Sequence, residues 1–158
     1  MNNGYSTSYT SLGDGKPLFS TGHTRADGGT AQSNASTSGI TLTESNLETG
    51  MLALENVLDN KGIGIDIYAD TLVVPPALRK EGFIIAKSES RSGTADNDLN
   101  VYNKSVVTVP GLVINQVKVW KYLGATLGGS DTAWFLLSSG EHKVTWMWAM
   151  KPQMHVVS

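Results

Sequence analysis

Apolar side chains recur at helical spacing between residues 43 and 59. Steps of four, three and four residues separate Leu47, Met51, Leu54 and Leu58, which places them on one face of a predicted helix. Capping-box spacing is found in Thr41 with Glu44 and in Ser45 with Glu48, and Gly62 supplies a stop signal. Gly50 lies in mid-helix, where glycine costs about 1 kcal/mol relative to alanine. We therefore expect packing, rather than intrinsic propensity, to stabilise this helix.

An extended segment, a buried strand and a second helix are predicted next. Ile63, Ile65 and Ile67 alternate with other residues, and the apolar run at 72–74 is typical of a buried strand. Two prolines at 75–76 cannot continue a central strand, but proline is tolerated in the first turn of a helix. The prolines therefore predict the end of a strand and the start of a helix over "ALRKEGFIIAK". Its expected inward side chains are Leu78, Phe83, Ile85 and Ala86.

A polar loop, Ser88–Asn100, separates this helix from three further predicted strands. The strand patterns are "VINQVKVWKY", "TAWFLLSS" and "HKVTWMWAM". Residues 1–41 are rich in Gly, Ser, Thr and Asn, and we expect irregular structure there, with one short strand near residues 18–21. The order of helix, strand, helix and three strands predicts an α+β (mixed α/β) fold with a small sheet flanked by helices.

Composition narrows the class of protein. The 158 residues indicate one domain, and a net charge of −2 gives no field for binding a nucleic-acid backbone. The chain has no cysteine, which excludes disulfides and thiolate sites. No apolar run approaches the roughly 20 residues of a membrane span, and the start lacks the pattern of a signal peptide. We therefore expect a cytosolic origin.

Few residues suggest catalysis or ligand binding. His23 lies near Ser20, Asp14 and Asp27 in the sequence, but no nucleophile elbow accompanies them. His142 and His155 lack metal-ligand spacing, and Asp96 with Asp98 lacks the distal Glu of a calcium loop. A carbohydrate platform and core packing are both open for the four tryptophans, Trp120, Trp134, Trp146 and Trp148. We assign no catalytic residue, metal or cofactor and expect no enzymatic activity.

Four phrases in order carry a family resemblance. They are "GKPLFSTGHTRADGGTAQSN", "DTLVVPPAL", "SRSGTADNDLN" and "TAWFLLSS". Together they resemble the Mu-like major head subunit family of tailed-phage and prophage capsid proteins, over roughly residues 13–153. The chain departs from the pattern at Ser92, where that family often has Pro, and at Asp96, where it often has Asn.

The resemblance implies the Hong Kong 97-type capsid fold, which encapsulin shells share. It implies a lead-in segment at 1–41, an axial-type domain at 42–140 and a strand at 141–158 that returns toward a peripheral domain. It also implies a structural protein that forms pentamers and hexamers of an icosahedral shell, in the virion and, before assembly, in the host cytoplasm. Because no spine helix, extended loop or arm is recognisable, we expect a fragment that is monomeric or weakly associating by itself.

In the resembling fold, the polar loop reaches the five- or six-fold axis, where copies of one loop meet. The resemblance thus implies subunit-interface roles for Arg91, Ser92, Gly93, Thr94, Asp96, Asn97, Asp98 and Asn100. The two aspartates would sit in a ring of like charges that Arg91 or bound cations must compensate. A solvated loop without contacts is the simpler interpretation. For the whole chain, three more functions stay open: an encapsulin-like shell protein, a small hydrolase using the His23 region, and a Trp-based carbohydrate-binding module.

Overall fold

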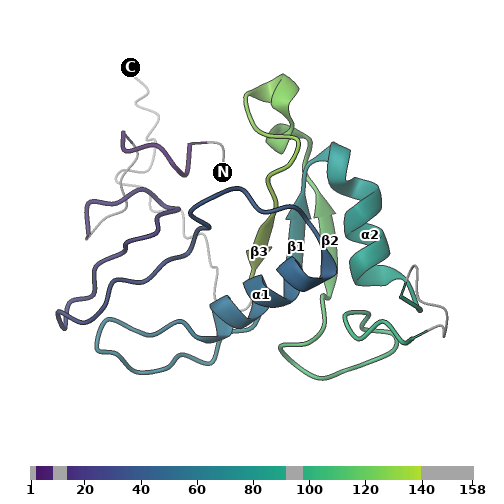
Figure 1. The fold of residues 1–158 in the computed structure, drawn as a ribbon, viewed down its shortest axis with the longest axis horizontal. Coiled ribbons are helices and arrows are strands. Elements are labelled where there is room, and N and C mark those ends of the chain that lie inside the picture. The colour runs from purple at the N-terminus through teal and green to yellow at the C-terminus, as the bar shows by residue number, and fades with distance from the viewer. Residues whose placement is uncertain (1–2, 9–13, 92–97, 140–158) are drawn as a thin grey trace, which may run out of the picture.

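A three-stranded sheet and two helices form the centre of the molecule in the computed structural model (Figure 1). The structure describes residues 3–8, 14–91 and 98–139. The strand order is β2-β1-β3, with β1 at Thr71–Val74, β2 at Gln116–Val119 and β3 at Phe135–Leu137. This small mixed sheet confirms the α+β class.

The central strand β1 is buried along its whole length. It pairs in parallel with β2 and antiparallel with β3, so that Leu72 lies between Val117 and Leu136. Burial on both faces explains why the run at 72–74 is continuously apolar instead of alternating. The three strands predicted around 72–74, 113–122 and 132–139 are thus confirmed, and the one predicted at 142–150 lies outside the described residues.

Both helices pack on the sheet face that carries Leu72 and Val74. Helix α1 spans Glu44–Glu55 and buries Leu47 and Met51 in this core, and helix α2 spans Arg79–Lys87 and adds Ala86. Leu54 is half-buried and packs against the same cluster. The predicted inner face of the first helix is therefore confirmed for the three positions that lie within α1.

The ends of α1 differ from the prediction. Thr43 caps its start by accepting a hydrogen bond from the Asn46 backbone N–H at 3.2 Å, so neither predicted capping box forms. The helix ends at Glu55, four residues earlier than expected, because Leu58 pairs with Gly64 in an isolated β-bridge. Gly62 serves the turn between them, with a positive φ of 82° that other residues rarely adopt.

The second helix begins as the prolines predict. A 3-10 turn at Pro76–Leu78 leads from β1 directly into α2. The sequence predicts an inward Phe83, but the structure leaves this side chain 45% exposed, so that prediction is wrong. The buried positions are Gly82 and Ala86, four residues apart, and a bulky side chain at 83 projects about 100° away from Gly82.

The lead-in segment contributes an aromatic side chain to the opposite face of the sheet. Val73 and Phe135 form a second cluster there with Leu123, and Phe19 packs against it. The Phe19 ring lies 5.0 Å from that of Phe135. The strand predicted near 18–21 is absent, and the described part of the segment is irregular apart from isolated bridges such as His23 with Gln32. Among the described residues, no helix is long and apolar enough to cross a membrane.

Candidate functional site

The polar loop at 88–100 has a fixed base. Its two ends pair antiparallel at Ser90 and Leu99. The Arg91 N–H donates to the Asp98 carbonyl at 2.8 Å, and the Asn100 N–H donates to the Glu89 carbonyl at 3.1 Å. The loop tip, residues 92–97, lies outside the described residues, together with the predicted contact residues Ser92, Gly93, Thr94, Asp96 and Asn97.

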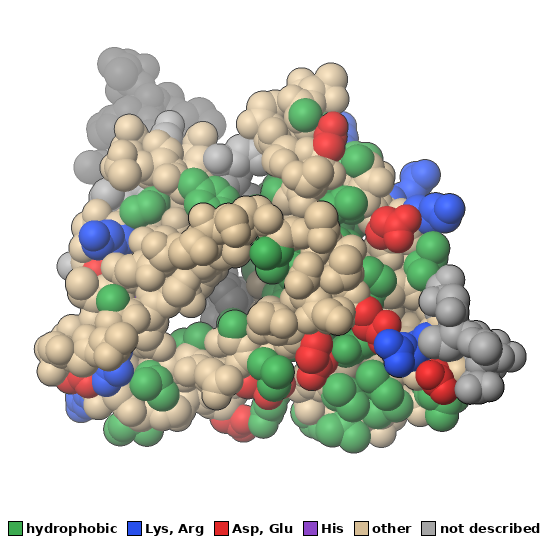
Figure 2. All heavy atoms as spheres, in the orientation of Figure 1, with side chains coloured by type: hydrophobic (Ala, Val, Ile, Leu, Met, Phe, Trp, Pro, Cys, Tyr) green, Lys and Arg blue, Asp and Glu red, His purple; other side chains and the backbone are tan. Residues whose placement is uncertain are grey.

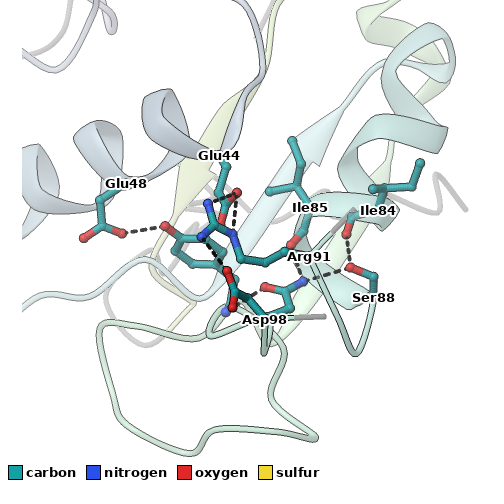
Figure 3. Close-up of polar contacts among 9 residues, drawn as sticks. Glu44, Glu48, Ile84, Ile85, Ser88, Arg91 and Asp98 are labelled. Carbon is teal, nitrogen blue, oxygen red and sulfur yellow. Dashed lines mark hydrogen bonds and ion pairs between the residues drawn. The ribbon is translucent and has the colours of Figure 1, made fainter. Parts of the chain in front are cut away.

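Asn100 anchors this base from inside. It is 2% exposed, and its amide nitrogen donates to the Ile85 carbonyl at 2.7 Å and to Ser88 Oγ at 3.1 Å (Figure 3). Its Oδ1 accepts the Tyr102 N–H at 3.0 Å. The resemblance implies a subunit contact for Asn100, but within this chain it joins the end of α2 to the segment that leaves the loop.

Arg91 connects the loop to the start of α1. Its Nε lies 2.8 Å from Glu44 Oε1, whereas its Nη1 lies 3.9 Å from Asp98 Oδ2. Figure 3 shows the guanidinium between the two carboxylates. Hydrogen bonding to Glu44, and then its charge, raise the pKa of Arg91. Arg91 thus lies within ion-pair distance of Asp98, but Glu44 is the closer partner.

Tyr102 makes a second connection to α1. The ring is buried, and its hydroxyl donates to Glu48 Oε2 at 3.0 Å. Burial raises the pKa of Tyr102 to about 12, and the hydrogen bond and charge of Glu48 add to the effect. Because Glu44 and Glu48 lie one turn apart, the loop base contacts two successive turns of α1.

The segment after the loop, residues 101–115, is hydrogen-bonded to the end of α2. Asn103 is buried, and its amide donates to the carbonyls of Lys87 and Ser88 at the end of α2. The Lys87 ammonium donates to the carbonyls of Ile114 and Asn115, both at 2.8 Å. Sequence patterns assign no role to this segment, and only the phrase "NVYN", two amides around an aromatic residue, signals it.

The histidine site does not form a triad. His23 Nδ1 lies 2.6 Å from Asp14 Oδ2, and Nε2 lies 3.2 Å from Asn34 Oδ1. The Ser20 hydroxyl instead accepts the Gly22 N–H, and Asp27 pairs with Arg25. His142 and His155 lie outside the described residues. Within the ranges that the structure describes, no three His, Cys, Asp or Glu side chains gather as a metal site.

The two described tryptophans pack rather than form a platform. Trp134 lies against the core under α1 and donates its indole N–H to the Ile40 carbonyl at 3.0 Å. Trp120 packs on the opposite sheet face, with Lys118 above its ring. The other two, Trp146 and Trp148, lie outside the described residues. Of the candidate features, the anchored polar loop is the one whose geometry suits a binding role.

Comparison with known proteins supports a structural role. No curated protein and no solved structure matches the chain. A profile of the family described as phage capsid protein matches residues 2–153, which is nearly the whole sequence. The chain therefore belongs to the phage capsid protein family.

Proposed function

We propose that this chain is the Mu-like type of major head subunit, with the axial-domain architecture of the Hong Kong 97-type fold. Family membership gives the coarser role directly: a structural protein of a phage capsid, which works by assembling into the shell of the virion. The finer proposal adds that the loop at 88–100 meets its copies around the axis of pentamers and hexamers.

The observation that carries this proposal is the anchoring of a polar loop. Asn100, Arg91 and Tyr102 fix its base to α2 and α1 through contacts of 2.7–3.1 Å. A loop that must meet several copies of itself gains from a preformed position, because less conformational freedom is lost on association. A solvated loop without contacts has no need of such a base.

The proposed ring contact brings like charges together, and these need compensation. Each copy would bring Asp98, whose side chain is 54% exposed, close to its symmetry mates. Like charges around an axis repel, and a nearby cation offsets this. Arg91 lies between Asp98 and Glu44 and can provide that offset in every copy.

Replacement of the loop tip tests the proposal. Residues 92–97 are exchanged for six Gly and Ser residues, and self-association is followed by electron microscopy and sedimentation. We expect an unfolding midpoint like that of the unmodified chain, together with weaker self-association. As a matched control, the same exchange is made in the largely exposed stretch at 35–40. Unchanged self-association of the tip variant would overturn the loop proposal, as would an equal loss in both variants.

A further inference from the structure

Charge is segregated along the described fold. Residues 43–70, which include α1, contain six acidic side chains and one basic one. Residues 71–127, which include α2 and β2, contain seven basic side chains and four acidic ones. The net charge of −2 therefore conceals two regions of opposite sign. In Figure 2 acidic side chains lie below α1, and Lys and Arg side chains project beside α2, next to an acidic side chain.

The positive region also exposes apolar side chains. Arg79, Lys80 and Phe83 share the outer side of α2, at spacings of three and four residues. Gly82 of the same helix approaches Val117, so α2 lies on the side of the edge strand β2 that carries Val117 and Val119, whereas Lys118 lies on the opposite side with Trp120. We call the following set the basic face: Arg79, Lys80, Phe83 and Val119. Its two cations form no ion pair within the described ranges, and Phe83 and Val119 are 45% and 36% exposed.

The negative region also combines exposed apolar side chains with charged ones, which here are acidic. Glu48, Leu52 and Glu55 follow one another along α1 at spacings of four and three residues. A Cβ built on Gly111 would touch both Glu55 and the Tyr68 ring, so these two side chains lie together, and the nearby Asp66 carboxylate raises the pKa of Tyr68. We call the following set the acidic face: Glu48, Leu52, Glu55, Asp66 and Tyr68. No described cation pairs with its three carboxylates, and Leu52 is 47% exposed.

We propose that the basic face of one copy docks on the acidic face of the next copy in the shell. Each face has exposed apolar side chains among charges, the usual anatomy of a specific interface. A contact between two identical faces would oppose like charges, which weakens such a pairing. A contact between the two different faces is heterologous and closes a ring when repeated by rotation. This inference rests on the proposed function and assigns the lateral contact that would accompany the loop at the axis.

Charge reversal tests the docking. Lys80→Glu and Asp66→Lys each place like charges across the contact, and both side chains are exposed, so folding should be unaffected. We expect self-association of the chain, measured by analytical ultracentrifugation, to weaken by about tenfold or more in each variant. A one-to-one mixture of the two variants should recover much of this association, because the introduced glutamate and the introduced lysine then face each other across alternate contacts.

Lys104→Glu is the matched control, since it makes the same charge change at an exposed residue outside both faces. Arg79→Glu provides a second variant of the basic face. Unchanged association in the single variants, a loss as large in the Lys104 control, or no recovery in the mixture would overturn the docking. Failure of the two proposals is distinguishable: loss of assembly only in the tip variant contradicts the docking, and loss only in the charge variants contradicts the loop contact.

Discussion

The Arg91 guanidinium holds the Glu44 carboxylate through Nη2, 2.9 Å from Oε2, across 47 positions of the sequence. Glu44 belongs to the first turn of α1, where a negative charge also interacts favourably with the helix dipole. The contact therefore connects the start of one helix with the base of the polar loop. Its role is positional, because both side chains remain partly exposed and water competes for them.

Arg91→Ala should therefore change the position of the loop more than the stability of the fold. We expect only a small fall in the urea midpoint, and faster hydrogen exchange at the amides of residues 91 and 100, whose bonds close the loop base. Lys104→Ala removes a comparable exposed cation and should leave this exchange unchanged. A large loss of stability, with exchange at those amides unaltered, would contradict this view of the contact.

Asn100→Ala should be much more costly. The substitution removes both amide donors and leaves the Ile85 carbonyl and the Tyr102 N–H without these partners in a buried environment. Each unsatisfied buried group costs about 1–3 kcal/mol, so we expect a loss of about 2–3 kcal/mol in the free energy of unfolding. Urea denaturation measures it, and exposed Asn115→Ala should change the same quantity by less than about 0.5 kcal/mol. Equal effects of the two substitutions would refute the anchoring role.

Local patterns predicted the centre of the fold well. The apolar run at 72–74 indicates a buried strand, and the prolines after it lack the N–H that would continue the strand. Both signals are local, so they specify the end of the strand without reference to distant residues. The end of α1 and the exposure of Phe83 depend on tertiary contacts instead. Gln32 bonds the backbone of Leu58 through both amide atoms, at 2.7 Å each, and such a contact across 26 residues has no local signal.

The sequence predicts the candidate site as a whole loop, but it does not predict the roles of the single residues in that loop. The run of polar residues at 88–100 indicates a loop, and the family resemblance indicates where such a loop lies. Neither separates Asn100, which is buried, from Asp98, which is exposed, because both are polar residues of similar size. Their difference arises from the end of α2, whose free carbonyls attract an amide and repel a carboxylate.

Core substitutions on α1 should follow burial rather than sequence spacing. Leu47 is 0% exposed, so Leu47→Ala should cost about 2–5 kcal/mol, the usual range for a large-to-small core change. Leu54 has the same place in the apolar repeat but is only half-buried, so its replacement by Ala should cost clearly less. Denaturation midpoints measure both, and a larger cost at Leu54 would show that the packing of α1 is misassigned.

The two helical glycines should respond differently to alanine. A Cβ on Gly50 would lie 2.9 Å from Leu136 Cδ1 and 3.4 Å from the Trp134 ring, so α1 packs closely on β3. A Cβ on Gly82 would lie 3.4 Å from Val117 and Val74, which is ordinary contact. Gly82→Ala should therefore gain up to about 1 kcal/mol, and Gly50→Ala should gain less or lose stability. Thermal unfolding compares them, and a full gain at Gly50 would contradict the close approach.

Tyr102 should make stability depend on pH in the alkaline range. Its folded pKa of about 12 lies above the ordinary value of 10.0, so the fold favours the neutral phenol. This stabilisation is fully present below pH 10 and is lost as the pH rises toward 12, because the unfolded chain then releases the proton first.

Tyr102→Phe provides the matched comparison, because it keeps the ring and removes the hydroxyl that donates to Glu48. We expect it to be less stable than the unmodified chain by about 0.5–1.5 kcal/mol near neutral pH. The difference between the two should shrink as the pH rises from 10 toward 12, because the phenol of the unmodified chain loses its advantage there. Urea denaturation at several pH values measures this, with the other tyrosines present equally in both proteins. A difference that stays constant over that range would show that the Tyr102 hydroxyl is not held in its neutral form by Glu48 and by burial.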